Sequence, residues 1–214
     1  RRTAGMNSRK SRFLDSPRVP SSTSANVSSS SRRAAVIVAA VVLAYANSLR
    51  GPFIWDDQLT VLENQQIRST RLSEILSPER ELPVAGRPLV NATLALNYAI
   101  GGLDVTGYHI VNVVFHVATA LVLFGLLRRA LTLPALAAGL SASAPNLALA
   151  STLLWAVHPL NTEAVNYVTQ RTELMMAFFY LLTMYASTRT ITVRATGKSE
   201  RFAWGEQLWL AIAV

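Results

Sequence analysis

The sequence predicts an all-α protein that crosses a membrane several times. Of its 214 residues, 51% are hydrophobic and only 15% are charged, which is less charge than a soluble domain usually carries. Long apolar runs recur along the chain, and they end at arginines or at aromatic residues, as membrane spans do. Since the basic residues behind the net charge of +8 stand at these run ends, we interpret the charge as topological and predict no nucleic-acid partner.

The amino-terminal part is expected to be a tail followed by a first span. Residues 1–33 are rich in Ser and Arg, so they should form a disordered, basic cytoplasmic tail. The apolar run Ala34–Leu49 is the first predicted span, extended by a snorkelling Arg33 and by the interfacial residues Phe53–Trp55. A cleaved signal peptide is the alternative, but no small-residue cleavage site follows Leu49, which favours an uncleaved anchor.

A long outer loop, residues 50–107, should follow the first span. Within it, Ile67–Leu76 is predicted as a short amphipathic helix. The run Leu89–Ile100 is too short and too polar to span, so it should lie in the membrane interface and end at Gly101 and Gly102.

Three further spans complete a predicted membrane core over residues 34–188. The clearest is Tyr108–Leu127, which Arg128 and Arg129 close. The third is placed at about residues 136–157, and the fourth at Glu173–Ser187. Residues 189–207 should then form a cytoplasmic loop, and residues 208–214 should start a fifth span, so we expect this chain to be the front part of a longer protein.

Polar residues should gather on the inner faces of two helices. His109, Asn112 and His116 follow helical spacing, so their common face should look into the protein, where hydrogen bonding between helices is the most frequent role of such residues. A helix that starts near Thr162 would bring a second polar stripe into the membrane, formed by Glu163, Asn166, Tyr167 and Gln170.

The distribution of charge predicts the orientation. With a cytoplasmic tail, the cytoplasmic segments hold fourteen Lys and Arg against six outside, and three acidic residues against nine. This asymmetry follows the positive-inside rule. We therefore expect a multi-pass membrane protein whose amino-terminal tail is cytoplasmic.

The stretch Gly51–Asn64 places two adjacent carboxylates, Asp56 and Asp57, just beyond the first span. They could simply solvate a loop, since acidic residues are common on exposed loops. A carboxylate at a membrane boundary can also act as a general base toward a hydroxyl, while an arginine holds the phosphate of a lipid. The outer face would then be suited to sugar transfer from a lipid phosphate.

Four motifs in unbroken order resemble the membrane region of the TMTC family, transmembrane and tetratricopeptide-repeat O-mannosyltransferases, and its bacterial relatives. The resemblance covers about residues 36–188, and any one motif alone would be weak. The motifs are Phe53-Ile-Trp-Asp-Asp with Glu63-Asn64, Arg87-Pro88-Leu89 through Leu96-Asn97-Tyr98-Ala99-Ile100-Gly101-Gly102-Leu103, Gly107-Tyr108-His109-Ile110-Val111-Asn112 through His116, and Ala156-Val157-His158-Pro159-Leu160-Asn161-Thr162-Glu163-Ala164-Val165 through Arg171-Thr172-Glu173-Leu174.

The resemblance implies a GT-C type, inverting glycosyltransferase of the bacterial inner membrane or the endoplasmic reticulum membrane. It implies a polyprenyl- or dolichyl-phosphate mannose donor, and an acceptor Ser or Thr hydroxyl on an exported protein. The family's further spans and its carboxy-terminal repeats, which stack into a protein-binding superhelix, are not in this chain, so the chain alone is expected to be inactive. We expect no cofactor, and we assign no metal ligand.

Within that reading, Asp57 or Asp56 would take the acceptor proton, with a slight preference for Asp57. Arg171 is the first candidate for the donor phosphate and Arg87 the second. Without the resemblance, an ion pair from Arg171 to Glu163 or Glu173 is equally expected, because charges inside membranes usually pair. The predicted sugar pocket consists of His109, His158, Glu163 and Glu173.

Two rival functions stay open at this point. A transporter or flippase of a lipid-linked sugar would need an arginine for the phosphate but no base. A non-enzymatic membrane anchor for a downstream repeat domain would need neither. Loss of the catalytic Asp separates these rivals, because only a transferase would lose its chemistry.

Overall fold

The computed structural model describes residues 22–133 and 137–195, and it contains no strand in these ranges. The all-α prediction is therefore confirmed for the described part of the chain. Its helical segments are α1 (Ser22–Tyr45), the 3₁₀ turn η1 (Ala46–Arg50), the π-helical turn η2 (Gln58–Leu62), the 3₁₀ turn η3 (Gln66–Arg68), α2 (Leu72–Ile75), α3 (Pro88–Gly101), α4 (Val105–Ala130), α5 (Ala137–Leu140), α6 (Ala144–Ala156), α7 (Asn161–Asn166) and α8 (Arg171–Ala195).

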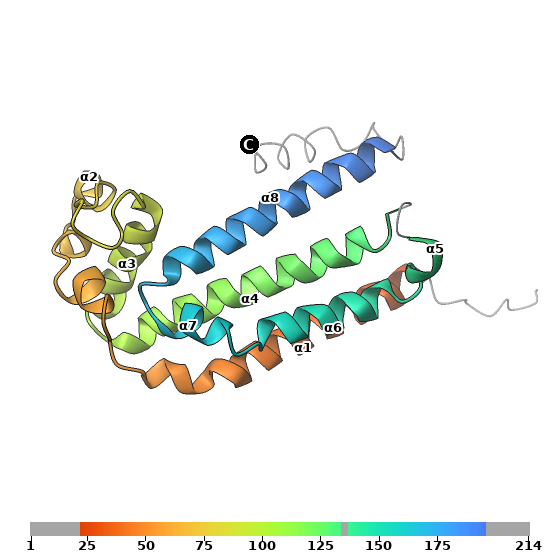
Figure 1. Cartoon of the computed structure of the whole chain (residues 1–214), viewed down its shortest axis with the longest axis horizontal. Coiled ribbons are helices and arrows are strands. Elements are labelled where there is room, and N and C mark those ends of the chain that lie inside the picture. Colours follow the sequence, from red (N-terminus) through yellow and green to blue (C-terminus); the bar gives the residue numbers. More distant parts are fainter. Residues whose placement is uncertain (1–21, 134–136, 196–214) are drawn as a thin grey trace, which may run out of the picture.

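Four of these helices form an elongated bundle (Figure 1). The central helix is α4, which packs against α1, α6 and α8. The segment between α1 and α4, with α2 and α3, lies at one end of the bundle together with α7, and α5 lies at the other end (Figure 1). Sequence positions 51–104 and 157–170 are thereby brought to the same end.

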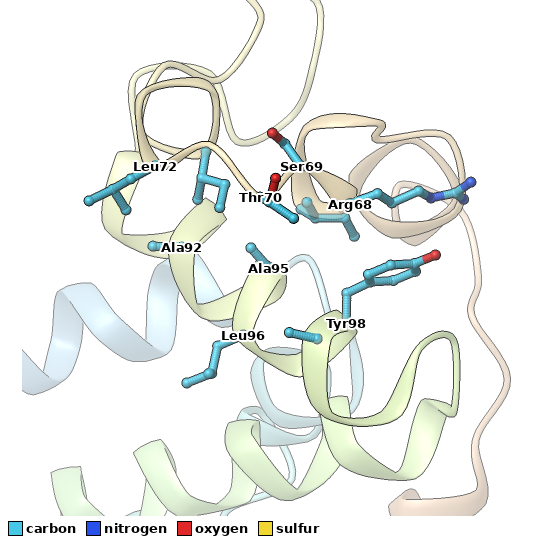
Figure 2. A pocket seen from close by; sticks show the side chains of 11 residues that line it. Arg68, Ser69, Thr70, Leu72, Ala92, Ala95, Leu96 and Tyr98 are labelled. Atoms are coloured by element: carbon cyan, nitrogen blue, oxygen red, sulfur yellow. The ribbon is translucent and has the colours of Figure 1, made fainter.

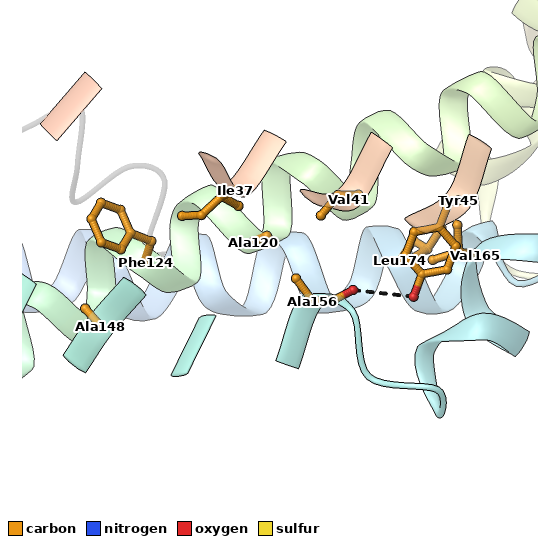
Figure 3. Close-up of a cluster of buried hydrophobic side chains, with 9 residues drawn as sticks. All are labelled: Ile37, Val41, Tyr45, Ala120, Phe124, Ala148, Ala156, Val165 and Leu174. Carbon is orange, nitrogen blue, oxygen red and sulfur yellow. Dashed lines mark hydrogen bonds between the residues drawn. The ribbon is translucent and has the colours of Figure 1, made fainter. Parts of the chain in front are cut away.

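Small and β-branched residues let the bundle helices pack closely (Figure 3). Ile37, Val41 and Tyr45 recur every fourth residue on α1 and are buried against the other helices, as helical spacing requires. The Tyr45 hydroxyl donates a hydrogen bond to the carbonyl of Ala156, with 3.4 Å between the oxygens. The other members of this buried cluster are Ala120, Phe124, Ala148, Ala156, Val165 and Leu174.

The outer surface of the bundle is apolar as well. Leu43 on α1 is 78% exposed and Leu154 on α6 is 72% exposed. Within the described residues, two helical stretches are long and apolar enough to cross a membrane, Ser29–Arg50 and Val105–Ala130. They overlap the first and second predicted spans, and apolar side chains on the outside of a bundle are what lipid contact requires.

Of the two other predicted spans, the third is interrupted in the structure and the fourth is one continuous helix. Helix α6 has thirteen residues, which makes it about 20 Å long, shorter than the hydrocarbon core. The expected span at 136–157 is broken because the turn Ser141–Ser143 separates α5 from α6. Helix α8 is long enough at 25 residues and continues past Ser187 into the expected cytoplasmic loop. The total number of spans stays a prediction.

Two further boundaries need correction. The expected disordered tail reaches residue 33, but α1 already begins at Ser22. Within α1, Arg33 donates hydrogen bonds to Ser29, one turn earlier, and to Asn146 of α6. The expected helix Ile67–Leu76 is two short pieces, η3 and α2, because the Ser69 hydroxyl accepts the Arg71 N–H and closes a turn between them. Residues 1–21 and the expected fifth span lie outside the described residues.

Candidate functional site

The two adjacent carboxylates of the stretch Gly51–Asn64, here called the acidic loop, have opposite environments. The Asp57 side chain is 0% exposed, whereas Asp56 is exposed. One Asp57 oxygen, Oδ1, accepts hydrogen bonds from the backbone N–H and the hydroxyl of Thr169, at 2.8 and 2.7 Å. The other, Oδ2, accepts from the backbone N–H of Ile54 at 3.3 Å. Asp57 therefore ties the loop to the turn that precedes α8.

The same turn is linked to the acidic loop a second time, since the Thr169 hydroxyl lies 3.1 Å from that of Thr60 on η2. By contrast, the Asp56 carboxylate makes no hydrogen bond or ion pair within the described part of the chain. A carboxylate that is exposed on a firmly held loop can approach a ligand without losing a structural contact. The loop thus presents Asp56 and uses Asp57 as its anchor.

Trp55, which precedes the pair, has an unusual backbone. Its φ of 51° lies in the left-handed region, and no other non-glycine residue of the described ranges has a positive φ. This conformation costs about 1–3 kcal/mol, and it persists only where surrounding contacts impose it. Here the contacts are hydrogen bonds from the backbone N–H groups of Asp57 and Gln58 to the carbonyls of Ile54 and Trp55, and from the Ile54 N–H to the Asp57 carboxylate. The indole is left 81% exposed.

The guanidinium of Arg171 lies inside the protein, between α3 and α4. Its side chain is 0% exposed. Nε donates to Asn112 Oδ1 at 2.9 Å, Nη1 to Asn97 Oδ1 at 2.7 Å and to Thr93 Oγ1 at 3.3 Å, and Nη2 to the carbonyl of Tyr108 at 2.9 Å. The Tyr108 ring also faces the guanidinium carbon, 5.9 Å from the ring centroid. Arg171 therefore joins α3, α4 and α8.

These contacts differ from both sequence-based expectations for Arg171. Its hydrogen bonds go to uncharged oxygens, and neither Glu163 nor Glu173 forms an ion pair with it; both are exposed. Burial lowers the pKa of Arg171 to about 9, opposed by the Tyr108 phenol and the Asp57 carboxylate. The side chain is charged at neutral pH, but it has no exposed surface that a donor phosphate could touch.

The other predicted site residues are not gathered into one pocket. His109 is buried, with Nε2 3.1 Å from the Gly51 carbonyl and no hydrogen-bond partner for Nδ1. His158 is exposed, and its Nδ1 accepts the Leu160 N–H at 3.2 Å. Arg87 is exposed and donates to the carbonyl of Pro83 at 2.7 Å. Of these residues, only His109 contacts the start of the acidic loop.

The inward face of α4 is as predicted. His109, Asn112 and His116 are all buried. Asn112 donates to the carbonyls of Val165 and Tyr167, and His116 Nε2 lies 2.8 Å from the Ala156 carbonyl, so this nitrogen carries the proton. Asn112 and His116 thus connect α4 to the end of α7 and to the end of α6, whereas His109 connects it to Gly51, just after η1.

The second predicted polar stripe is wrong, because α7 ends at Asn166. Tyr167 is extended, with ψ of 127°, and α8 starts only at Arg171. The break is fixed by partners remote in sequence. Asn112 donates hydrogen bonds to the carbonyls of Val165 and Tyr167 at the end of α7, and Asp57 accepts hydrogen bonds from the N–H and hydroxyl of Thr169. Glu163 and Gln170 therefore do not share one helical face.

Several residues of this region had no sequence signal of their own. Thr169 is one threonine among many, and Thr93 and Asn97 stand in a run that reads as an interfacial helix. A faint signal existed, because polar residues that interrupt the apolar run 89–100 need partners when buried. Within the described residues, no group of three His, Cys, Asp or Glu side chains could hold a metal ion.

Comparison with known proteins identifies relatives. The chain is 30% identical over 162 residues to the mouse protein O-mannosyl-transferase TMTC3, which covers 71% of this chain and 16% of that protein. It is 33% identical to the Drosophila melanogaster protein O-mannosyl-transferase Tmtc1 over 74% of this chain and 18% of that protein. For Tmtc2 of the same fly, the identity is 35% over 79% of this chain and 18% of the relative.

The chain thus spans about a sixth of the length of these relatives. No family model matches the chain, and no solved structure matches it. The relatives agree in name across mouse, human, worm and fly. Over the matched part of its length, this chain is similar to the TMTC protein O-mannosyl-transferases, and the resemblance that its motifs predicted is confirmed.

Proposed function

We propose that this chain is part of a membrane glycosyltransferase that moves mannose from a polyprenyl- or dolichyl-phosphate donor to Ser or Thr hydroxyls of exported proteins. The names of its relatives support mannosyl transfer to protein. The apolar outer surface of the bundle supports a membrane setting, in which a lipid-linked donor is available. The part of the family's length that this chain does not span would supply the rest of the catalytic unit and the acceptor-binding surface.

The division of labour within the Asp pair carries this proposal. A base must be exposed to its substrate and held in place. Asp56 is exposed, while Asp57 is buried and anchors the loop through Thr169. This arrangement supports Asp56 as the base rather than Asp57, the residue slightly preferred from the sequence.

The transfer itself can be written with balanced atoms. The acceptor hydroxyl oxygen attacks the anomeric carbon of mannose, and Asp56 takes the hydroxyl proton. The bond from that carbon to the phosphate oxygen breaks, and the electron pair leaves with the lipid phosphate. Because the nucleophile arrives opposite to the leaving group, the anomeric configuration inverts. An arginine would hold the phosphate; the sequence suggested Arg171 first and Arg87 second, and of these two only Arg87 is exposed.

Substituting the two aspartates separately tests the proposal in the full-length protein. Asp56→Asn keeps the shape but removes the basicity, so mannose transfer should slow by about 10²–10⁴-fold with little change in donor affinity or thermal stability. Asp57→Asn replaces one of two accepting oxygens by a donor group, so it should lower thermal stability first. Transfer from a radiolabelled lipid-phosphate mannose and thermal unfolding in detergent give the two readouts.

Glu63→Gln is the matched control, because Glu63 is an exposed carboxylate in the same region, and it should leave the transfer rate unchanged. A transporter or a membrane anchor would tolerate Asp56→Asn. If the transfer rate of Asp56→Asn stays within about threefold of the wild type, well under the effect of a lost base, Asp56 is not the base.

A further inference from the structure

A groove lies on the segment between α1 and α4, residues 51–104, here called the outer segment. It is separate from the acidic loop and lies between α3 on one side and η3 with α2 on the other (Figure 2). It has a volume of about 480 Å³, within the range of about 300–1,000 Å³ that is usual for small-molecule sites. Its floor is formed by alanines of α3, and Leu72 and Leu96 stand at its sides (Figure 2). No site residue predicted from the sequence lines it.

Helix α3 carries two parallel rows of apolar side chains, one exposed and one that lines the groove. Leu89, Leu96 and Ile100 follow helical spacing and are all exposed, so this row is suited to the membrane interface. The other row consists of Ala92, Ala95 and Ala99, also at helical spacing, and it forms the floor of the groove. An apolar chain can therefore pass from lipid into the groove without crossing a polar surface.

A cation stands at the far side of the groove. The Arg68 side chain extends over the Tyr98 ring, with its guanidinium carbon 5.6 Å from the ring centroid (Figure 2). Its one hydrogen bond goes to the Leu62 carbonyl, at 2.6 Å from Nη2. The nearby carboxylate of Glu74 forms an ion pair with Arg71 and accepts a hydrogen bond from the Ser69 hydroxyl. Within the described residues, Arg68 has no carboxylate partner, so its charge is free to meet an anion.

We infer that this groove binds the lipid-phosphate part of the donor, an assignment that rests on the proposed function. The first isoprene units of a polyprenyl phosphate lie along the alanine row, and the phosphate pairs with Arg68. A single linear chain fits one groove with a single apolar approach, whereas a phospholipid with two acyl chains would leave one chain outside. Arg68 thereby takes the role that the sequence suggested for Arg171 and Arg87.

Equilibrium binding of a fluorescent polyprenyl phosphate without sugar tests the groove independently of catalysis. The full-length protein is placed in nanodiscs of zwitterionic lipid. Arg68→Gln should weaken binding about tenfold or more, as expected for the loss of a charged hydrogen bond, and Arg68→Lys should restore part of the affinity. Ala99→Trp, at an exposed position that lines the groove, should obstruct it and weaken binding similarly.

Two substitutions serve as matched controls. Arg80→Gln removes an exposed charge from the same outer segment, and Ile100→Trp places the same indole side chain on α3 outside the groove. Both should bind polyprenyl phosphate as the wild type does. Wild-type affinity in both Arg68→Gln and Ala99→Trp, loss of binding in Arg87→Gln instead, or equally tight binding of phosphatidic acid would each overturn the assignment.

The outcomes separate this assignment from the proposed function. If Asp56→Asn abolishes transfer while both groove variants bind normally, the transferase stands and the groove is wrong. If the groove variants lose binding but Asp56→Asn transfers mannose normally, the groove stands and the assigned base is wrong.

Discussion

At the scale of single residues, the buried guanidinium of Arg171 has the clearest structural role. It donates four hydrogen bonds to groups on α3 and α4. A buried charge is tolerated only when its hydrogen-bonding groups are satisfied. Asn97, Asn112 and the Tyr108 carbonyl are positioned for this purpose, so their identities are coupled to that of Arg171.

This coupling predicts the effect of Arg171→Gln. The shorter, neutral side chain leaves at least one buried oxygen among Asn97, Asn112 and Tyr108 without a donor, at a cost of about 1–3 kcal/mol for each such group. Thermal unfolding of the full-length protein in detergent should therefore occur at a clearly lower temperature. Arg50→Gln, which removes an exposed arginine, should leave it unchanged.

The alternative role of Arg171 makes the opposite prediction. If this residue held the donor phosphate, Arg171→Gln would weaken donor binding and spare the stability of the protein. A stable variant with weak donor binding would thus return Arg171 to the binding site.

At the scale of elements, the sequence predicted those helix boundaries that depend on neighbouring residues alone. Helix α3 starts at Pro88 and is followed by the C-cap residue Gly102, where φ is 60°, and both residues mark helix ends by their backbone preferences. The break between α7 and α8 has no such signal, because Asp57 and Asn112 impose it from more than fifty residues away. For the same reason, the sequence could propose an Asp pair but could not divide its roles.

The start of α4 offers a test at this scale. Asp104 is the N-cap residue, and its side chain accepts the Thr106 N–H at 3.0 Å. Asp104→Ala should destabilise the protein by about 0.5–2 kcal/mol, whereas Asp104→Asn keeps a capping oxygen and should retain most of the stability. Thermal unfolding measures both. Glu81→Ala removes an exposed carboxylate outside any helix and controls for the lost charge; equal losses in all three variants would rule out capping.

At the scale of the whole molecule, charge is segregated along the bundle. All acidic residues of the described ranges lie in the segments around α2, α3 and α7, at the start of α4 or at the start of α8. The opposite end carries Arg32 and Arg33 of α1, Arg128 and Arg129 of α4, and Arg189 of α8. Arg128 donates to Ser30 at this end, so the arginines also help to hold α1 against α4. The fold thus brings together, at one end of the bundle, arginines that stand at the ends of separate apolar runs in the sequence.

This segregation predicts that the arginine-rich end faces the cytoplasm. Because the chain has no cysteine, single cysteines report exposure without background. In sealed vesicles whose cytoplasmic face is outward, an impermeant thiol reagent should label Ser141→Cys, at an exposed position between α5 and α6. Gln65→Cys, exposed on the outer segment, should be protected until detergent opens the vesicles. The reverse pattern would invert the orientation, and labelling of both before detergent would mean that the bundle does not separate its two ends across a membrane.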